Sequence, residues 1–300
     1  MRKELILEIN RTSHLLGQKT WFMGVINVTP DSFSDGDSYF DTDKAVNRGE
    51  ELAAQGADII DIGGESSRPG SDPVSAEEEM RRILPVISKL RKRIQVLISV
   101  DTTKSEVARA ALDEGADIIN DISSFRFDPH MGAVVAQKKV PVVLMHMQGT
   151  PKTMQTNPYY EDVVGEVKDF LREKIEQAQA LGIKKEKIII DPGIGFGKRM
   201  KDNLTLINNL HSLEDLQRPI LVGVSRKSFI GRILDLPPQD RLEGTIASSI
   251  LSLMRGAHIL RIHDVEAVRR AIQVAEAIMG ENFYPSSLQK NTHRKNNHVC

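Results

Sequence analysis

Short apolar runs alternate with longer segments of helical periodicity along most of the chain. Such runs predict buried strands, and the periodic segments between them predict amphipathic helices. The predicted strands cover residues 23–28, 57–62, 95–100, 118–120, 140–145, 187–190, 220–224 and 257–262. The predicted helices cover 43–55, 104–114, 129–138, 160–181, 203–211, 239–255 and 264–279, and another begins at the capping-box sequence Ser75-Ala76-Glu77-Glu78. This alternation indicates an α/β protein with a parallel sheet.

Two near-duplicate segments support these predicted strand and helix boundaries. Residues 55–61 read Gln-Gly-Ala-Asp-Ile-Ile-Asp, and residues 114–120 read Glu-Gly-Ala-Asp-Ile-Ile-Asn. Each joins the end of a helix to a strand, with glycine where a helix commonly stops. A succession of eight strand–helix units predicts a TIM (β/α)8 barrel. A doubly wound open sheet is the alternative, but it gives no reason for polar residues at nearly every strand end.

The two ends of the chain differ from this repeating part. Residues 4–9 alternate apolar and polar positions, and residues 20–23 could pair with them as a short β-hairpin. We therefore expect an N-terminal hairpin over 1–22 that caps the barrel, and the barrel itself over 23–280. The segment 281–300 is polar and basic, which predicts a disordered tail.

Composition excludes several classes of protein. Among 300 residues, 40% are hydrophobic and the formal net charge is -1, which argues against general nucleic-acid or membrane binding. The sole cysteine is Cys300, so neither an intrachain disulfide nor a cysteine zinc site is expected. The chain has no long apolar stretch, and its first residues do not resemble a signal peptide. We expect a cytoplasmic protein.

The segment from Asp191 to Lys198 combines the end of a predicted strand with three alternating glycines. A Walker loop requires four residues before Gly-Lys and then Ser or Thr, but only three precede Gly197 and arginine follows Lys198. A dinucleotide-binding fingerprint would need glycine at 198. The sequence thus predicts a different loop, in which Asp191 points into a polar cavity.

Polar residues occur at nearly every predicted strand end, and the strand ends of a barrel share the face where catalysis occurs. Four of these residues could meet the donor and acceptor edge of a flat nitrogen heterocycle: Asp101, Asn120, Asp191 and Lys227. A second group is typical of a phosphate or diphosphate site: Ser67, Arg68, Arg261 and His263. Asn27 offers a neutral oxygen that suits Mg²⁺.

No residue in the sequence resembles an activated nucleophile. There is no Gly-x-Ser-x-Gly elbow, and Ser225 has no evident base partner in the sequence. This favours a reaction whose leaving group departs with electrostatic help. The predicted connection over residues 29–42 is long for a strand–helix loop, and loops of this kind are usually lids or binding loops.

Motifs over about residues 20 to 280 resemble those of dihydropteroate synthases, in the same order. These motifs are Asn27-Val-Thr-Pro-Asp-Ser-Phe-Ser-Asp-Gly36, Gly63-Gly-Glu-Ser-Ser-Arg-Pro-Gly70, Asp101-Thr-Thr-Lys104, Asn120-Asp-Ile122, Met145-His-Met-Gln-Gly149, Asp191-Pro-Gly-Ile-Gly-Phe-Gly-Lys198, Ser225-Arg-Lys-Ser228 and Arg261-Ile-His-Asp-Val265. The resemblance implies a transferase of folate biosynthesis with a TIM barrel. It would condense 6-hydroxymethyl-7,8-dihydropterin diphosphate with 4-aminobenzoate to give 7,8-dihydropteroate and diphosphate, and sulfonamides would compete with the aminobenzoate.

The resemblance also implies residue roles. The pterin would bind Asp101, Asn120, Asp191 and Lys227, the diphosphate would bind Ser67, Arg68, Arg261 and His263, and the aminobenzoate would lie against Phe33, Pro69, Lys227 and Ser228. Mg²⁺ would bind Asn27, and Lys227, Arg261, His263 and Asp101 would carry catalysis. Diphosphate would leave first, with help from Mg²⁺, before the arylamine attacks a pterin methyl cation. A homodimer is implied as well.

Two positions depart from the family pattern. Ser67 stands where threonine is usual, and Asp37 stands where a second glycine is common. Two alternatives remain open at this point: a pterin-binding domain of a corrinoid methyltransferase, and a non-catalytic pterin-binding paralogue. Retention of the first-loop motif and of Lys227, Arg261 and His263 argues against both.

Overall fold

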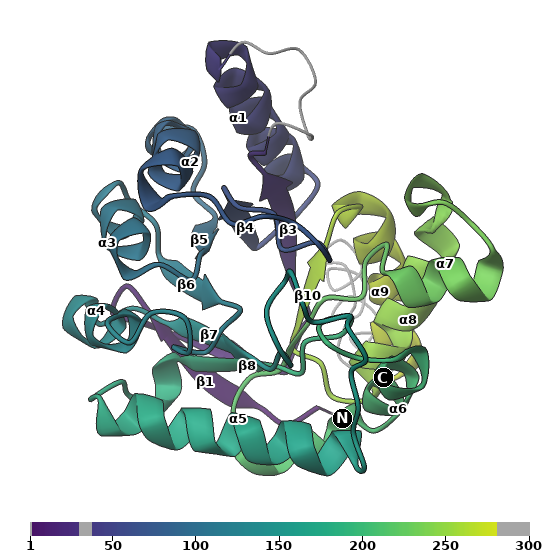
Figure 1. Cartoon of the computed structure of the whole chain (residues 1–300). Coiled ribbons are helices and arrows are strands. Elements are labelled where there is room, and N and C mark those ends of the chain that lie inside the picture. Colours follow the sequence, from purple (N-terminus) through teal and green to yellow (C-terminus); the bar gives the residue numbers. More distant parts are fainter. Residues whose placement is uncertain (1, 30–37, 281–300) are drawn as a thin grey trace, which may run out of the picture.

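The computed structural model describes residues 2–29 and 38–280, and within these ranges eight parallel strands form the wall of a barrel (Figure 1). The strands are β3 (Trp21–Asn27), β4 (Ile59–Gly63), β5 (Leu97–Asp101), β6 (Ile118–Asp121), β7 (Val142–Met145), β8 (Ile188–Asp191), β9 (Leu221–Val222) and β10 (Ile259–Ile262). They are hydrogen-bonded in the order β8-β7-β6-β5-β4-β3-β10-β9. A parallel bridge between Ile190 and Ile220 connects the two ends of this order. The predicted barrel is confirmed, and the open sheet is excluded.

Helices surround the strands (Figure 1). They are α1 (Ser38–Ala54), α2 (Ala76–Arg91), α3 (Ser105–Asp113), α4 (Met131–Lys138), α5 (Val163–Ala180), α6 (Met200–Asn208), α7 (Ser228–Leu234), α8 (Leu242–Met254) and α9 (Val265–Ile278), with short 3-10 turns η2 (Lys185–Lys187), η3 (Leu210–Leu216) and η4 (Pro238–Asp240). The hydroxyl of Ser75 accepts a 3.2 Å hydrogen bond from the Glu78 amide, so the expected start of α2 is confirmed. The sequence did not predict α7, and α1 begins earlier than the expected 43.

Side chains along each strand alternate between two cores, because successive residues of a strand point to opposite faces. In β4, Ile59 belongs to the cluster inside the barrel, whereas Ile60 and Ile62 belong to the larger cluster between the strands and the helices. Asp61 therefore points inward, and it is fully buried. This alternation determines which strand-end residues face the barrel interior.

The N-terminal hairpin differs from the expected one. Its strands are β1 (Leu5–Ile9) and β2 (Thr12–Leu16), and they pair from Leu5 with Leu16 to Ile9 with Thr12. Residues 20–23 are not its second strand, because Trp21–Asn27 is the first strand of the barrel wall. The turn residues Asn10 and Arg11 have φ of 49° and 64°. Tight hairpin turns require this left-handed conformation, which arginine seldom adopts, so no strong local signal marks a turn here.

The hairpin covers the amino-terminal end of the barrel. Leu7, Ile9 and Leu16 are buried in one cluster with residues from the starts of the wall strands, including Ile59 and Ile259. The polar strand-end residues predicted to form the site lie at the opposite, carboxyl-terminal end. In the described part of the chain, no helix is long and apolar enough to cross a membrane. The tail predicted over 281–300 lies outside the described residues.

Candidate active site

Asn27, Asp101 and Asn120 lie in one row of paired residues at the carboxyl ends of the strands. Gly63 pairs with Asn27 on one side and with Asp101 on the other, and Asp101 pairs in turn with Asn120. Paired residues of neighbouring strands point to the same side of the sheet. A Cβ at Gly63 would lie 3.4 Å from Cβ of Asp101 and 3.9 Å from Oδ1 of Asn27, so glycine leaves room between them.

Asp61 lies one layer deeper and connects two of the predicted groups. Its Oδ2 accepts hydrogen bonds from Nε of Arg261 at 2.7 Å and from Nδ2 of Asn120 at 3.1 Å. Asn120 was predicted to contact the heterocycle and Arg261 to contact the diphosphate. One buried carboxylate thus sets the positions of both side chains. The sequence pattern places Asp61 in a strand, but contains no signal for these two partners.

Arg261 also donates from Nη2 to Oδ2 of Asp101 at 2.9 Å. Burial raises the pKa of Asp101 to about 7, although the neighbouring Arg261 opposes this rise. Burial by itself would lower the pKa of Arg261, but the carboxylates of Asp61 and Asp101 outweigh it, so the pKa is raised. Arg261 therefore stays charged between two carboxylates, at the boundary between the two predicted subsites.

Asp191 ends β8 and is 6% exposed. Its Oδ1 accepts a 2.7 Å hydrogen bond from the amide of Gly193. Burial raises the pKa of Asp191 to about 6, and Lys227 and Arg261 are among the cations that oppose this rise. Gly193 has a φ of 68°, and a Cβ there would lie 1.9 Å from the carbonyl oxygen of His146. Only glycine permits this approach, so the glycines let the loop pack against the segment after β7.

Lys198, at the end of the same loop, turns inward and is 3% exposed. Its Nζ lies 2.9 Å from Nδ1 of His146 and donates to the carbonyl oxygens of Gly193 at 2.9 Å and Phe196 at 3.0 Å. Burial lowers the pKa of Lys198 to about 7 and that of His146 to about 2. A neutral His146 can accept from the lysine. Lys198 therefore holds the loop in place, a role that the glycine spacing could not reveal.

Lys227 enters the site from the loop after β9. Its Nζ lies 4.3 Å from the centroid of the Phe196 ring, a cation–π contact. Burial lowers the pKa of Lys227 to about 8, and the nearby Arg261 lowers it further. A Cβ at Gly195 would lie 3.2 Å from Cδ of Lys227, so the glycine loop also makes room for this side chain. The loop after β9 and the glycine loop after Asp191 thus bring Lys227 to the Asp191 side of the site.

His263 contacts a residue for which the sequence offered no partner. Its Nδ1 lies 3.0 Å from Oγ of Ser225, and its backbone amide donates to the same oxygen at 3.2 Å. The expectation that Ser225 lacks a base neighbour is therefore wrong, but this hydroxyl is buried and already accepts a backbone hydrogen bond. Burial lowers the pKa of His263 to about 4, so the imidazole is neutral at pH 7. It can donate a hydrogen bond to an anion, whereas the positive charge comes from Arg261.

The loop after β4 carries Ser67, Arg68 and Pro69, of which Ser67 is half-buried and the other two are exposed. The amide of Gly70 donates to the carbonyl oxygen of Pro151 at 3.1 Å, so this loop leans on the loop after β7. Ser228 is exposed at the start of α7, next to Lys227. Phe33, together with the departure at Asp37, lies outside the described residues.

Asn27 was the predicted Mg²⁺ ligand. Its side chain is half-buried and makes no hydrogen bond in the described part of the chain, so the amide oxygen is available. In the same residues no group of three or more His, Cys, Asp or Glu side chains could hold a metal ion. Mg²⁺ accepts few protein ligands when waters and substrate phosphates complete its shell. The residues therefore fit a magnesium ion that arrives with a diphosphate.

Comparison with known proteins gives a consistent result. The family described as "Pterin binding enzyme" matches residues 23–263. A dihydropteroate synthase of Synechocystis sp. is 46% identical over 273 residues, which cover 91% of this chain and 94% of that protein. The chain belongs to the dihydropteroate synthase family.

Solved structures of dihydropteroate synthases agree with this assignment. The enzyme of Xanthomonas albilineans with 4-aminobenzoic acid is 44% identical, with a TM-score of 0.86 and coverage of 92% of this chain and 99% of that chain. The Yersinia pestis enzyme in complex with a sulfonamide drug is 42% identical, with a TM-score of 0.86 and coverage of 92% and 100%. The resemblance inferred from the motifs is thereby confirmed along nearly the whole barrel.

Proposed function

We propose that the protein condenses 6-hydroxymethyl-7,8-dihydropterin diphosphate with 4-aminobenzoate, forming 7,8-dihydropteroate and releasing diphosphate. The observation that carries this proposal is the junction at Asp61. There Asn120, which is predicted to bind the heterocycle, and Arg261, which is predicted to bind the diphosphate, share one buried carboxylate. A substrate that joins a flat ring to a diphosphate through one methylene would span these two groups.

The pterin would be recognised by its hydrogen-bonding edge. Asp191 and Asp101, when ionised, accept hydrogen bonds from ring N–H and exocyclic amine groups, while Asn120 and protonated Lys227 donate to ring acceptors. Phe196, whose ring already contacts Lys227, would border the ring system. The two carboxylates also favour positive charge on the pterin, which grows as the leaving group departs.

The reaction breaks the bond between the pterin methylene carbon and the diphosphate oxygen, and that oxygen keeps the electron pair. Arg261 supplies positive charge at this point, Arg68 and Ser67 would approach from the β4 loop, and His263 would donate a hydrogen bond. A magnesium ion held by Asn27 would add further positive charge at the diphosphate oxygens. The amine nitrogen of aminobenzoate forms the new bond to carbon and loses a proton to solvent.

The aminobenzoate would bind next to Lys227 and Ser228, with Pro69 and Phe33 from the first two loops closing over it. An arylamine is nucleophilic when neutral, so no general base is required. A sulfonamide resembles this substrate in shape and would compete for the same place, in keeping with the drug complex of the Yersinia pestis enzyme.

The relatives do not favour the methyltransferase or the non-catalytic alternative, because they are named as synthases.

The deciding assay combines purified protein, Mg²⁺, the pterin diphosphate and labelled 4-aminobenzoate. We expect labelled dihydropteroate and stoichiometric diphosphate, and we expect Lys227→Ala to abolish both. Absence of product above background from the wild-type protein would refute the proposal.

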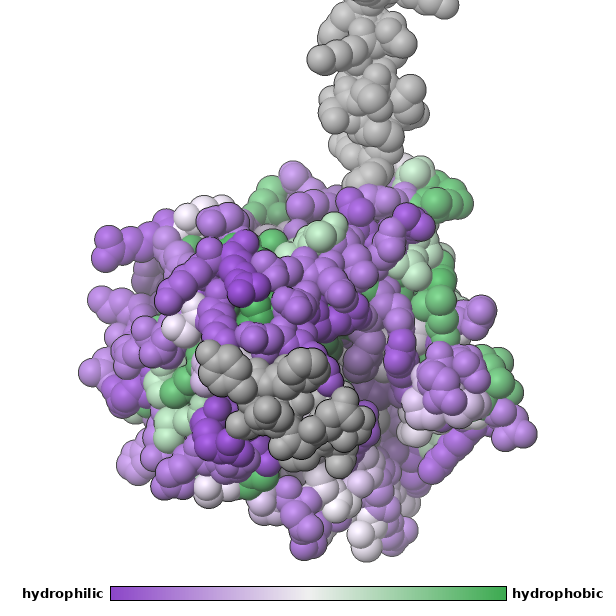
Figure 2. Space-filling view, turned by 90° about the horizontal axis from the view of Figure 1, so that it is seen from above, coloured by the Kyte–Doolittle hydropathy of each residue, from purple (hydrophilic) through white to green (hydrophobic). Residues whose placement is uncertain are grey.

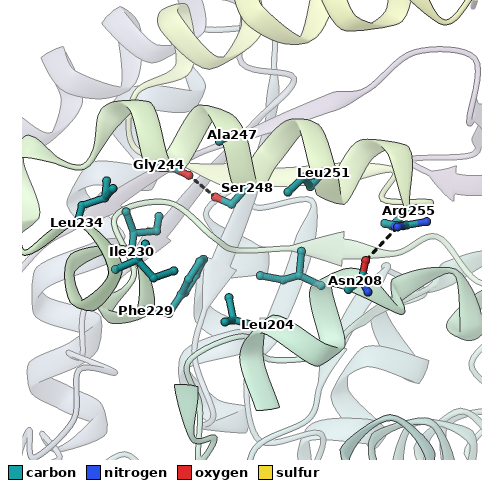
Figure 3. Close-up of a pocket in the computed structure, with 12 residues that line it drawn as sticks. Leu204, Asn208, Phe229, Ile230, Leu234, Gly244, Ala247, Ser248, Leu251 and Arg255 are labelled. Carbon is teal, nitrogen blue, oxygen red and sulfur yellow. Dashed lines mark hydrogen bonds between the residues drawn. The ribbon is translucent and has the colours of Figure 1, made fainter. Parts of the chain in front are cut away.

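A homodimer is also proposed, through the surface formed by α6, α7 and α8. Figure 2 shows apolar side chains at the right-hand side of the molecule, where Figure 1 places α7 and α8. Four large apolar residues there are exposed, namely Ile233, Leu234, Leu251 and Met254. They adjoin a groove of ≈ 300 Å³ that Figure 3 shows between these helices, lined by Leu204, Phe229 and Ile230 among others. Exposed apolar patches of this kind commonly mark protein–protein contacts.

The remaining expectations concern partners and location. We propose that the partners are the two small-molecule substrates and a second copy of the chain, with no nucleic acid and no membrane. The cytoplasmic location expected from the sequence stays a prediction.

A further inference from the structure

A second cavity lies at the opposite end of the barrel from the candidate active site. It is bordered by the turn of the N-terminal hairpin, the C-terminal end of α4 and the segment that leads into β8. Its volume of ≈ 410 Å³ falls within the range of small-molecule sites. Lys187 lines it immediately before β8, whereas Asp191 ends the same strand. The four residue steps from Lys187 to Asp191 separate the two sites by roughly 13 Å.

The lining of this cavity is strongly cationic. It contains the cations Arg11, Lys138, Lys139, Lys184 and Lys187, and the carboxylate of Glu8. The carboxylate of Glu8 pairs with Lys184 at 3.6 Å, and Lys138 pairs with Asp113 outside the cavity. In the described ranges, Arg11 and Lys139 make no ion pair. A concave surface with charges of one sign concentrates the field and attracts counter-ions.

Lys187 is the unusual member of this group, because it is 8% exposed and therefore largely withdrawn from water. Its Nζ donates to the backbone carbonyl oxygen of Glu8 at 3.2 Å, and no carboxylate of the described chain lies within ion-pair distance of it. An ammonium group has three donors, and buried charges are normally paired. Burial lowers the pKa of Lys187 and neighbouring Lys184 adds to this effect, whereas the charge of Glu8 opposes it. A bound anion would pair with this lysine.

The remaining wall of the cavity is apolar, formed by Val135, Ala136, Val140 and Ile183. We propose that this cavity binds a small phosphorylated molecule with a flat or apolar body, such as a nucleoside diphosphate. The phosphates contact Lys187 and the cationic rim, and the ring lies against the apolar wall. The ligand touches both the hairpin and the segment that leads into β8, so its binding also stabilises the contact between them.

The test is a calorimetric titration of the full-length protein with ADP, with inorganic phosphate as the probe that lacks a ring. The proposed catalytic site would also bind phosphate groups, so wild type is compared with Arg261→Ala. We expect ADP to bind both proteins, more tightly than phosphate, and Lys187→Met to weaken this binding by roughly tenfold or more. Lys92→Met removes an exposed lysine at the end of α2 that does not line the cavity, and serves as the matched control.

Three outcomes would overturn the proposal. If Arg261→Ala abolishes ADP binding, the ligand occupies the catalytic site alone. Equal weakening by Lys187→Met and Lys92→Met would show that only overall charge matters, and equal affinity for ADP and phosphate would remove the role of the apolar wall. Should Lys187→Met fail to fold, the exposed Lys139→Gln variant tests the same rim. Dihydropteroate synthesis is assayed in parallel, so a failure of this site is separate from a failure of the catalytic proposal.

Discussion

Arg261 donates a 2.7 Å hydrogen bond to the fully buried carboxylate of Asp61. The guanidinium group could instead extend into solvent, but this contact and its second one, to Asp101, hold it at the strand ends. Breaking a buried ion pair is costly, since it leaves one charge uncompensated. Arg261 is thus positioned before any ligand binds, and pre-positioned charge stabilises a departing anion without further reorganisation.

Asp61→Asn should impair catalysis although Asp61 is not among the residues predicted to touch a ligand. We expect kcat/KM to fall roughly tenfold to a hundredfold, because a charge-assisted hydrogen bond contributes about 1.5–3 kcal/mol. Binding of the pterin diphosphate should weaken more than binding of a pterin that lacks diphosphate. Steady-state kinetics and calorimetry with both ligands measure this difference.

Asp117→Asn is the matched control for that variant. Asp117 is also a buried carboxylate, and it pairs with Arg91 at 2.5 Å. It lies just before the start of β6, away from the candidate site. It should lower thermal stability and leave ligand affinity intact. If both variants change affinity equally, the effect of Asp61 is on stability alone.

Pterin affinity should fall at both low and high pH, which gives an acidic and an alkaline limb. Asp191 and Asp101 offer two acceptor oxygens and a negative charge to the pterin only when ionised. Burial raises their pKa values to about 6 and about 7, so affinity should fall as pH decreases through this range. Lys227 donates as an ammonium group with a pKa lowered to about 8, so affinity should fall again as pH rises above that value. Titrations between about pH 5 and about pH 9 would record both limbs. Lys227→Arg keeps its charge at high pH, and the alkaline limb should then disappear.

Lys198→Met tests the support beneath the Asp191 loop. The change leaves two buried carbonyl oxygens, of Gly193 and Phe196, without their shared donor. The Gly193 oxygen keeps a 3.1 Å hydrogen bond from the Phe196 amide, but loss of a buried donor costs about 1–3 kcal/mol, so the loop should loosen. We expect the KM for the pterin substrate to rise roughly tenfold, with a smaller change in kcat. Lys201→Met, on the exposed side of α6, should leave both constants unchanged. A fall in kcat alone would argue against a positioning role.

Magnesium should bind only together with the diphosphate. Asn27 offers a single amide oxygen, and the described residues hold no acidic cluster that could retain the ion alone. Calorimetry should therefore show no Mg²⁺ binding to the protein until pterin diphosphate is present. Asn27→Ala should raise the Mg²⁺ concentration required for half-maximal activity, whereas Asn27→Asp, which adds a charge, should lower it. Tight binding without substrate would contradict this assignment.

Leu251→Glu should disrupt the proposed dimer. Leu251 is 51% exposed on α8 beside the apolar groove, and a buried, unpaired carboxylate in an interface is unfavourable. Sedimentation velocity should show dimers for the wild type and monomers for this variant. Ile6→Glu alters a similarly exposed residue, 52% exposed, on β1 and should leave the dimer intact. Identical sedimentation of all three proteins would argue against this interface.

The sequence predicts the barrel and the strand-end residues because both follow from local patterns. An apolar run that stops at a polar residue identifies a strand end, and Asp101, Asn120 and Asp191 all lie at or next to the last residue of their strands. Arg261 likewise lies next to the last residue of β10, but its partner Asp61 lies in the middle of β4. Their contact joins residues far apart in sequence, so no local pattern could reveal it.

Other features escaped prediction for related reasons. The inward turn of Lys198 depends on how the loop folds back on His146, which glycine spacing alone does not determine. The helix α7 has seven residues with Gly231 within it, too short for a clear helical period. The second strand of the hairpin follows a turn that contains Arg11 rather than glycine. In each case tertiary contacts outweigh local preference.

The contact between β8 and β9 also has a dynamic consequence. β9 pairs with β10 through Leu221 and Val222, whereas the side that faces β8 has an isolated bridge between Ile190 and Ile220, the residue before β9. So few backbone hydrogen bonds make this seam the part of the wall where amide hydrogens should exchange soonest with solvent. Asp191 ends β8, and Lys227 lies in the loop after β9. A ligand that binds both residues would connect β8 to the loop after β9, so it should slow local opening of the wall and the exchange of these amides.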